Sequence, residues 1–326
     1  MDTNFRSPLN QLKAGEHLEL LSDVAQLYYM QGMNQSEIAK KIGIDRSTVS
    51  RMLSEARRLK IVEIRINHPL STNQGLETEL EKKYGLKQAC VVVNQAEEYG
   101  QLLRRLGIAG ANVLMTYLSP NQILGLSWGT AVSSVVDAIQ MTGQAPLKII
   151  QLVGALGAHN DVYDGRGLVQ RLAQKLESQA YFLNAPFLVE SPEIAQALKN
   201  TPSISEALIL GQECDSALMG IGSTETEHSS FFQAGYIPLE ELEALQDKGM
   251  VGDVCGLHFD LNGHTPDLAF HKRIITIQPE ALRSIPHRFG VAGGIRKLKP
   301  ILGAICTGYV NILITDEVAA IELLKA

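Results

Sequence analysis

The sequence is poor in the residues that mark several large classes of protein. Aromatic residues make up 6% of the 326 residues, and there are one tryptophan and four cysteines. The cysteines lie far apart, with no CxxC pair and no histidine at ligand spacing, which argues against a disulfide framework and against a metal site. We expect a reduced, cytoplasmic protein that holds no metal or other cofactor. Its expected buried thiols are Cys90, Cys214, Cys255 and Cys306.

Long apolar runs are missing as well. The most apolar stretch, Ile301–Ile314, has 14 residues and includes two glycines and an asparagine. A helix that spans a bilayer needs about 20 apolar residues. The N-terminus is polar and lacks the apolar core of a signal peptide. We therefore expect no association with a membrane.

The length and the charge favour two domains of different character. A chain of 326 residues with 45% hydrophobic residues is long enough for two domains with substantial cores. The net charge of −6 is unevenly distributed. Residues 35–66 carry eight Lys and Arg against four Asp and Glu, whereas residues 68–326 carry nineteen against twenty-seven. A basic segment joined to a larger acidic body is consistent with a DNA-binding regulator.

The stretch from Gln35 to Leu53 has the spacing of a helix-turn-helix. Gly43 stands where the chain must turn sharply, because a residue without Cβ adopts positive φ at little cost. Asn34 followed by Glu37 fits a capping box for the first helix, and Asp45 is a good N-cap for the second. Apolar residues suited to the inner faces recur at helical spacing: Ile38, Ala39, Ile44, Val49, Met52 and Leu53.

The outward face of the second helix is predicted to contact DNA. The N-terminal end of this helix enters the major groove in helix-turn-helix proteins. Arginine suits bidentate contact with guanine, and serine and threonine suit base edges or phosphates. The alternative is an ordinary helical hairpin with a solvated charged face. The predicted DNA-binding residues are Gln35, Arg46, Ser47, Thr48, Ser50 and Arg51, flanked by phosphate-contacting Lys40, Lys41, Arg57, Arg58 and Lys60.

Elements on either side of this motif complete the first part of the chain. An amphipathic helix over residues 17–31 ends at Gly32, and the alternating Ile61–Ile66 predicts a short strand like a wing. Residues 69–73 are typical of a linker, followed by a helix that ends at Gly85 and packs on the second domain or on another subunit. The predicted domains are 1–67 for DNA binding, 68–87 as linker and oligomerisation helix, and 88–326 for an effector.

From residue 88 onward, short apolar runs alternate with helical patterns. Continuous apolar strands separated by helices predict an α/β domain, doubly wound around a mainly parallel sheet. The expected strands are 89–93, 123–126, 148–153, 180–183, 217–221, 274–277, 288–292 and 312–315. The expected helices include 101–118, 130–141, 166–178, 192–200 and 295–304.

Three of these strands are followed by loops rich in glycine and hydroxyl residues. The loops are 127–130, 154–157 and 220–224, and ligands of open α/β sheets bind beyond such strand ends. Any one of the loops can be a structural turn, but three together favour an anion site, most simply for phosphate. No Walker sequence and no GxGxxG between strand and helix is present, which disfavours a nucleotide. The loops supply Ser127, Gly129, Thr130, Gly154, Gly157 and Gly222 as effector-binding candidates.

Two charged residues have two interpretations each. Asp253 can accept sugar hydroxyls, or it can form an Asx turn. Lys297 can reach a phosphate, although the residues alone favour a surface lysine. The histidines form no compact ligand set, which agrees with the absence of a predicted metal site.

Taken together, these segments resemble the SorC-type (SorC/DeoR) family of bacterial sugar-responsive transcriptional regulators over nearly the whole chain. The resemblance rests on AQLYYMQGMNQSEIAKKIGIDRSTVSRMLSEARRLKIVEIRIN at residues 25–67. It continues in ILGLSWGTAV, ALMGIGS, GDVCGLHFDLNG, GVAGG with the following Lys297, and NILITDE, in this order.

The resemblance implies a winged-type helix-turn-helix joined to an effector domain that resembles phosphosugar isomerases. It also implies a homotetramer that binds operator DNA under the control of a sugar or sugar phosphate. The motifs that match the family contain six residues that the resemblance assigns to the effector site: Ser127, Gly129, Thr130, Gly222, Asp253 and Lys297. Gly165-Arg166-Gly167 departs from the family, which usually has Asn or Glu near there, so Arg166 itself is a candidate contact for an acidic ligand group.

Parts of the sequence are also compatible with two other functions. The segment Asp215–Gly222 resembles the strand of glucosamine-6-phosphate deaminases, which would make the protein an active phosphosugar isomerase or deaminase with a DNA module. Those enzymes continue with Asp-Gly-His, whereas this chain continues with Ser223-Thr224-Glu225 and lacks the histidine for proton transfer. We therefore expect no catalytic residues and no enzyme activity. An architectural DNA binder without effector control would leave the second domain without a role.

Overall fold

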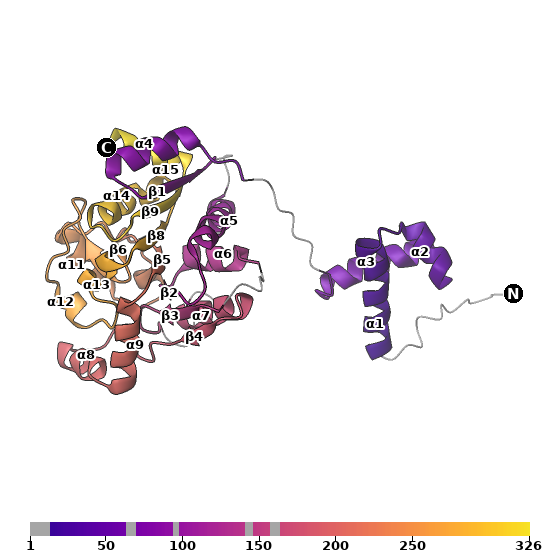
Figure 1. Cartoon of the computed structure of the whole chain (residues 1–326), viewed down its shortest axis with the longest axis horizontal. Coiled ribbons are helices and arrows are strands. Elements are labelled where there is room, and N and C mark those ends of the chain that lie inside the picture. Colours follow the sequence, from indigo (N-terminus) through magenta and orange to yellow (C-terminus); the bar gives the residue numbers. More distant parts are fainter. Residues whose placement is uncertain (1–13, 63–69, 94–97, 141–145, 157–163) are drawn as a thin grey trace. The chain divides into compact units, whose positions relative to one another are not determined.

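The computed structural model describes residues 14–62, 70–93, 98–140, 146–156 and 164–326. It divides the chain into two compact units, Met1–Pro69 and Leu70–Ala326 (Figure 1). Each unit has its own buried apolar cluster. The two units are therefore described separately.

The first unit is a small helical bundle. Helix α1, Ala14–Ala25, continues into a π-helical turn, Gln26–Met30, and is followed by α2, Gln35–Ile42, and α3, Arg46–Arg58. Leu21 and Val24 of α1 pack with Ile38 of α2 and with Val49 and Leu53 of α3, and all five side chains are buried. Burial of apolar area on this scale is the main stabilising contribution to a three-helix unit. The predicted wing strand is not seen at residues 61 and 62, which form a bend, and its remainder lies outside the described residues.

The second unit is a seven-stranded parallel sheet in the order β1-β9-β8-β5-β2-β3-β4. This confirms the predicted doubly wound α/β architecture. In that order the strands are Gln88–Val92, Ile312–Asp316, His287–Val291, Ser216–Gly220, Ile123–Leu126, Lys148–Gln151 and Gln179–Tyr181. A separate antiparallel hairpin consists of β6, Gly252–Val254, and β7, Leu257–Phe259.

Helices cover both faces of the sheet, and the alternation of side chains along the strands explains why. On β1, Cys90 and Val92 point to one face and Ala89 and Val91 to the other, because successive strand residues face opposite ways. Helices α5, Tyr99–Tyr117, α6, Thr130–Ala138, and α7, Gly165–Lys175, pack on the first face. The second face is covered by α4, Gln74–Tyr84, α11, Leu239–Asp247, α13, Pro279–Ser284, α14, Leu298–Cys306, and α15, Glu317–Lys325. The remaining helical segments are α8, Pro192–Lys199, α9, Pro202–Gln212, α10, Ser230–Gln233, α12, Ala269–Lys272, and the 3-10 turn η3, Ile295–Lys297.

Some predicted elements were wrong, each for a physical reason. Residues 274–277 are buried but make only isolated bridges, from Ile274 to Leu188 and from Thr276 to Val153, so an apolar run marked a buried connection rather than a strand. At the end of the segment expected to be a linker, Asn73 N donates to Val91 O and Thr72 bridges Val92, so these residues lie along β1. Of the four thiols, that of Cys306 is exposed rather than buried.

The β6–β7 hairpin rests on a buried aromatic and histidine cluster. His258 on β7 lies directly opposite Asp253 on β6, and its ring stacks on His271 with centroids 5.7 Å apart. Nε2 of His271 accepts the backbone N–H of His258 at 2.9 Å. Nδ1 of His258 has no hydrogen-bond partner among the described residues. Burial lowers the pKa of His258 to about 3, assisted by the neighbouring His271, and burial lowers the pKa of His271 to about 4.

These histidines predict a pH-dependent stability. Both must be neutral in the folded protein, whereas in the unfolded chain they bind a proton below about pH 6.5. The free energy of unfolding should therefore fall as the pH is lowered from about 6.5 to about 4. Burial raises the pKa of Asp253 to about 6, and this single group opposes the trend without reversing it, since two histidines act against it.

Chemical denaturation at several pH values measures this dependence. The variant His258→Phe should show a shallower fall and unchanged or higher stability at pH 7, because it removes a buried polar atom that lacks a partner. His228→Asn, in a surface turn, serves as the control and should keep the wild-type slope. A His258→Phe profile parallel to that of the wild type would contradict the assignment.

Candidate functional site

The geometry between α2 and α3 is that of a helix-turn-helix. Gly43 has φ +78° and its N–H donates to Ala39 O, which ends α2 in the left-handed conformation that glycine favours. The predicted capping box is confirmed, since Asn34 Oδ1 accepts the Glu37 N–H and the Glu37 carboxylate accepts the Asn34 N–H. At the start of α3, Asp45 Oδ1 accepts the Thr48 N–H at 2.8 Å, so the predicted N-cap is confirmed as well.

The N-terminal turns of α3 present polar side chains to solvent, with one exception. Arg46, Ser47, Ser50 and Arg51 are exposed, and Gln35 at the start of α2 is half-buried. Thr48 is only 6% exposed, so the expectation that it lies on the outward face was wrong. Its position in the helix turns it towards the bundle and towards Asp45, whose Oδ2 accepts the Thr48 hydroxyl at 2.6 Å.

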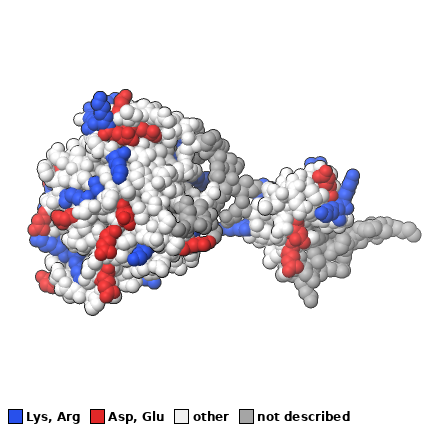
Figure 2. Space-filling view, in the orientation of Figure 1, with Lys and Arg blue, Asp and Glu red and all other residues white. Residues whose placement is uncertain are grey.

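Basic side chains flank this face. Lys40 and Lys41 at the end of α2 and Arg57, Arg58 and Lys60 at the end of α3 are all exposed. Arg58 also pairs with Glu55 at 3.1 Å, as befits neighbours three residues apart on a helix. On the face of the first unit drawn in Figure 2, Lys and Arg side chains stand among Asp and Glu side chains. In helix-turn-helix proteins such cations contact phosphates, while the N-terminal turns of the second helix contact the bases.

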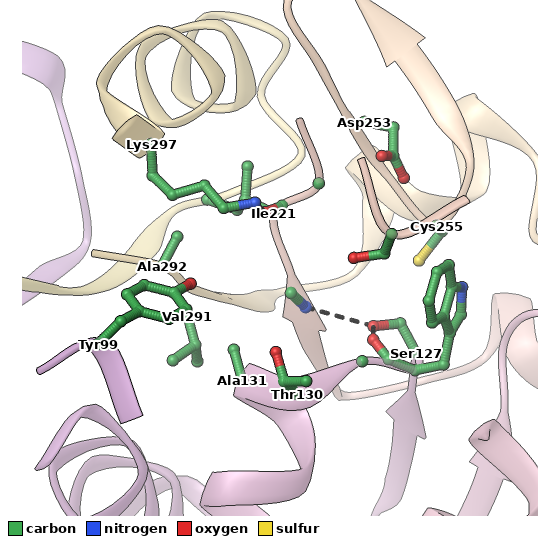
Figure 3. A pocket seen from close by; sticks show the side chains of 15 residues that line it. Tyr99, Ser127, Thr130, Ala131, Ile221, Asp253, Cys255, Val291, Ala292 and Lys297 are labelled. Atoms are coloured by element: carbon green, nitrogen blue, oxygen red, sulfur yellow. Dashed lines mark hydrogen bonds between the residues drawn. The ribbon is translucent and has the colours of Figure 1, made fainter. Parts of the chain in front are cut away.

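The second unit has a pocket at the point where the order of strands in the sheet reverses, between β2 and β5. The chain proceeds from β2 to β3 and β4 on one side, and from β5 to β8 and β9 on the other. The loops that leave β2 and β5 therefore separate, which opens a crevice at the carboxyl ends of the strands. The pocket is lined from these ends by the loop after β2, the end of β5, the end of β8, the β6–β7 hairpin and η3 (Figure 3).

The loop after β2 supplies hydroxyls and free N–H groups. Ser127 is buried; its N–H donates to Leu218 O at 3.1 Å and its Oγ accepts the Gly220 N–H at 3.3 Å, which ties β2 to β5. Gly129, the residue before α6, has φ +115°, a conformation that glycine adopts and other residues rarely do. Among the described residues no side-chain hydrogen bond caps the start of α6, so the first N–H groups of this nine-residue helix, next to Thr130, can bind an anion.

The end of β5 is shaped around Asp253. Gly222 N donates to Asp253 O at 2.8 Å, and a Cβ on Gly222 would lie 1.8 Å from Asp253 Oδ1. Only glycine at position 222 leaves room for the Asp253 carboxylate at this place. Asp253 is 6% exposed, and its Oδ2 accepts the Gly256 N–H at 3.1 Å, so this residue both forms the turn and lines the pocket. Burial raises its pKa to about 6, opposed by that N–H and by the Lys297 charge.

Lys297 reaches into the pocket rather than into solvent. Its Nζ donates to Ile221 O at 2.8 Å, and the side chain is seen extended towards Ile221 in Figure 3. Burial lowers its pKa, opposed by the charges of Asp253 and Glu225. The preference for a surface lysine was therefore wrong. An ammonium group has three donors, so two remain beyond the bond to Ile221 for a ligand.

Two predicted residues, Gly154 and Arg166, are not among those that line this pocket, and a third cannot be placed. Gly154 packs against the Pro186–Phe187 backbone, where a Cβ would lie 2.7 Å from Pro186 O, so its role is close packing. Gly157 lies outside the described residues. Arg166 is exposed, its guanidinium group donates to Asn184 Oδ1 at 2.9 Å and lies over the Phe182 ring, and it does not line this pocket.

Several residues of the lining were not predicted from the sequence. Tyr99 comes from the first turn of α5, outside any motif, and Ser230 from the short α10. Cys255 lies in the β6–β7 turn, where its φ is +55°. The two strands of this hairpin have three residues each, which is too short for an alternating pattern to be recognised in the sequence. The remaining lining residues outside the predicted set are Trp128, Ala131, Gly220, Ile221, Val291 and Ala292.

The pocket presents several kinds of polar group to a ligand. One carboxylate, one ammonium group, hydroxyls and backbone amides line it, and none of its described lining residues is a histidine. Among the residues that the structure describes, no group of three or more His, Cys, Asp or Glu is arranged to hold a metal ion. No described helix combines the length and apolar composition that crossing a bilayer requires.

Family models match both units. Residues 68–325 match the Sugar-bind family, described as "Putative sugar-binding domain", and residues 21–55 match the MarR family. The first match covers most of the chain, and the second covers the helix-turn-helix.

Named relatives match the chain along almost its whole length. The sorbitol operon regulator of Klebsiella pneumoniae is 31% identical over 316 residues, covering 96% of this chain and 100% of the relative. The deoxyribonucleoside regulator of Bacillus subtilis is 29% identical over 310 residues, covering 95% and 98%. The crystal structure of the full-length sorbitol operon regulator SorC from Klebsiella pneumoniae superimposes with a TM-score of 0.71, covering 94% of this chain and 99% of that chain.

These relatives are named as regulators and not as enzymes, in agreement with the absence of a predicted activity. The pattern of motifs, the two-unit fold and the full-length matches all lead to the same assignment. The chain belongs to the SorC-type family of sugar-responsive bacterial transcriptional regulators.

Proposed function

We propose that this protein binds operator DNA through α3 and that a sugar phosphate, bound in the pocket of the second unit, controls this binding. The observation that carries the proposal is the pocket at the point where the strand order of the sheet reverses. There the uncapped N-terminus of α6 and the ammonium group of Lys297 line one crevice together with a buried carboxylate. The relatives named above are a sorbitol operon regulator and a deoxyribonucleoside regulator, names that support an effector related to carbohydrates.

A phosphate suits one part of this pocket. Free N–H groups and the dipole at the N-terminus of α6 favour an anion, and the Lys297 ammonium adds a full positive charge with two unused donors. Ser127 and Thr130 provide hydroxyls beside these groups. This set supports Ser127, Gly129, Thr130, Gly222 and Lys297 as effector-binding residues.

A sugar suits the other part. The Asp253 carboxylate can accept hydrogen bonds from two hydroxyls, and the rings of Trp128 and Tyr99 offer apolar surface to the carbon skeleton. Tyr99 remains 51% exposed, so its ring is open to a ligand at the pocket mouth. Asp253 therefore completes the proposed effector site.

At the DNA, we assign the base contacts to Arg46, Ser50 and Arg51, with Gln35 and Ser47 at the edge of the interface. All but Gln35 are exposed at the N-terminal end of α3. We further propose a cytoplasmic homotetramer, in which an effector acts by binding one arrangement of subunits more tightly than another. An effector that bound both arrangements equally would shift nothing.

Thermal unfolding of the full-length protein against a panel of sugars and their phosphates tests the effector assignment. A ligand at about 100 times its Kd should raise the stability by about 2.7 kcal/mol, which is readily measured. The same compound should change operator binding in a mobility-shift titration. A panel in which sugar phosphates produce neither effect, with free sugars active instead, would contradict the phosphate part of the proposal.

A further inference from the structure

Thr48 occupies an unusual place on α3 for a residue next to the reading face. It is 6% exposed, yet its hydroxyl group contacts one exposed reading residue. Nη2 of Arg51 donates to Thr48 Oγ1 at 3.0 Å, and Thr48 Oγ1 donates to Asp45 Oδ2 at 2.6 Å. The hydroxyl is thus both donor and acceptor, and it links an exposed arginine to a capping carboxylate.

Asp45 is itself held in place. Its Oδ1 accepts the Thr48 N–H at 2.8 Å and the hydroxyl of Ser47. These hydrogen bonds, first from Ser47 and then from Thr48, hold the pKa of the Asp45 carboxyl well below its usual range. The anion fixes the direction of the Thr48 proton, so the lone pairs of Thr48 Oγ1 are directed to Arg51.

An arginine side chain loses considerable rotational freedom when it is fixed on a base. A partner that already restrains it in the free protein reduces this loss. The guanidinium group has five N–H donors, so one bond to Thr48 leaves enough for a bidentate contact with guanine.

We infer that Thr48 is a positioning residue for DNA reading: its buried hydroxyl, oriented by Asp45, holds the Arg51 guanidinium in the direction from which it contacts a base. This inference rests on the proposed function, in which Arg51 contacts the operator. Thr48 itself contacts Arg51 and not the DNA.

The test uses full-length variants and begins with operator selection. Selection from a random DNA library with the wild type and with Arg51→Ala identifies the base pair whose preference depends on Arg51. Binding of Thr48→Val, which has the same shape without the hydroxyl, is then measured on operators with each base at that position. The preference is the ratio of the affinity for the operator with the selected base to the affinity for operators with the other bases at that position. We expect this ratio to fall roughly 2- to 10-fold, as for the loss of one hydrogen bond, and the affinity for non-specific DNA to be unchanged.

Three comparisons separate positioning from packing. Thr48→Ser keeps the hydroxyl and should keep the wild-type preference. In the Arg51→Ala background, Thr48→Val should have no further effect on operator affinity. Ser54→Ala, which removes a hydroxyl bonded to Ser50 O on the same helix, should leave the preference unchanged.

An unchanged preference in Thr48→Val would overturn the inference while leaving the proposed function intact. Equal losses in Thr48→Val and Thr48→Ser, or a further loss in the Arg51→Ala background, would also overturn it, since they indicate a packing role. A wild-type protein that selects no sequence would contradict the proposed function itself, and the positioning role would fall with it.

Discussion

Arg51→Ala is expected to lower operator affinity more than about 30-fold without changing the fold. Arg51 is exposed at the N-terminal end of α3, where helix-turn-helix proteins read the major groove. One bidentate arginine contact is worth about 1–3 kcal/mol of discrimination, and an operator with two half-sites loses it twice. The two losses add to roughly 2–6 kcal/mol, and each 1.4 kcal/mol is tenfold in affinity.

Titration of a labelled operator with the full-length variant measures this loss. The matched control is Arg58→Ala, which removes the same charge from the exposed end of α3. This control should weaken binding modestly and to the same extent on all sequences, because a phosphate contact carries no sequence information. If Arg51→Ala bound the operator as the wild type does, the reading face would have been assigned wrongly.

Lys297→Met should reduce effector affinity by roughly 10- to 100-fold, because charge-assisted hydrogen bonds to the phosphate are lost. Methionine keeps the length and apolar stem of lysine, so the pocket wall is retained. The variant should keep close to the wild-type stability without ligand, since the Lys297 side chain is half-buried and makes one hydrogen bond, to Ile221 O.

Effector titrations by thermal unfolding and by release of operator DNA measure this change. Lys299→Met, an exposed lysine two residues further along, is the control and should respond as the wild type does. Operator binding without effector should be normal in both variants. A wild-type dose response in Lys297→Met would place the phosphate away from Lys297.

The helix-turn-helix was predictable because its determinants are local. The Asn34–Glu37 capping box, the Asp45 cap and the left-handed Gly43 involve residues no more than a few positions apart. Such relations can be recognised in a sequence without knowing the rest of the fold. The same holds for the alternation of apolar strands and helices, which predicted a doubly wound sheet.

The prediction of the sheet was less complete, because an apolar pattern indicates that a segment is buried but not that it pairs with other strands. Residues 274–277 have the apolar character of a strand, but they form only isolated bridges and do not join the sheet. Conversely, β6 and β7 are too short to show a pattern, and only their pairing places Asp253 opposite His258. Pairing depends on which segments become neighbours, and local sequence does not specify that.

By itself, the sequence determined the reading helix, the class of fold and the glycine-rich loops at the strand ends, since each depends on near neighbours along the chain. Only the tertiary structure decided which loops converge. Lys297 meets Ile221 across 76 positions, and Gly222 admits the Asp253 carboxylate, while Gly154 is used in packing and Arg166 is held elsewhere. It also turned Thr48 inward. The physical reason is that strand order and burial result from contacts distant in sequence, and these alone bring the pocket together.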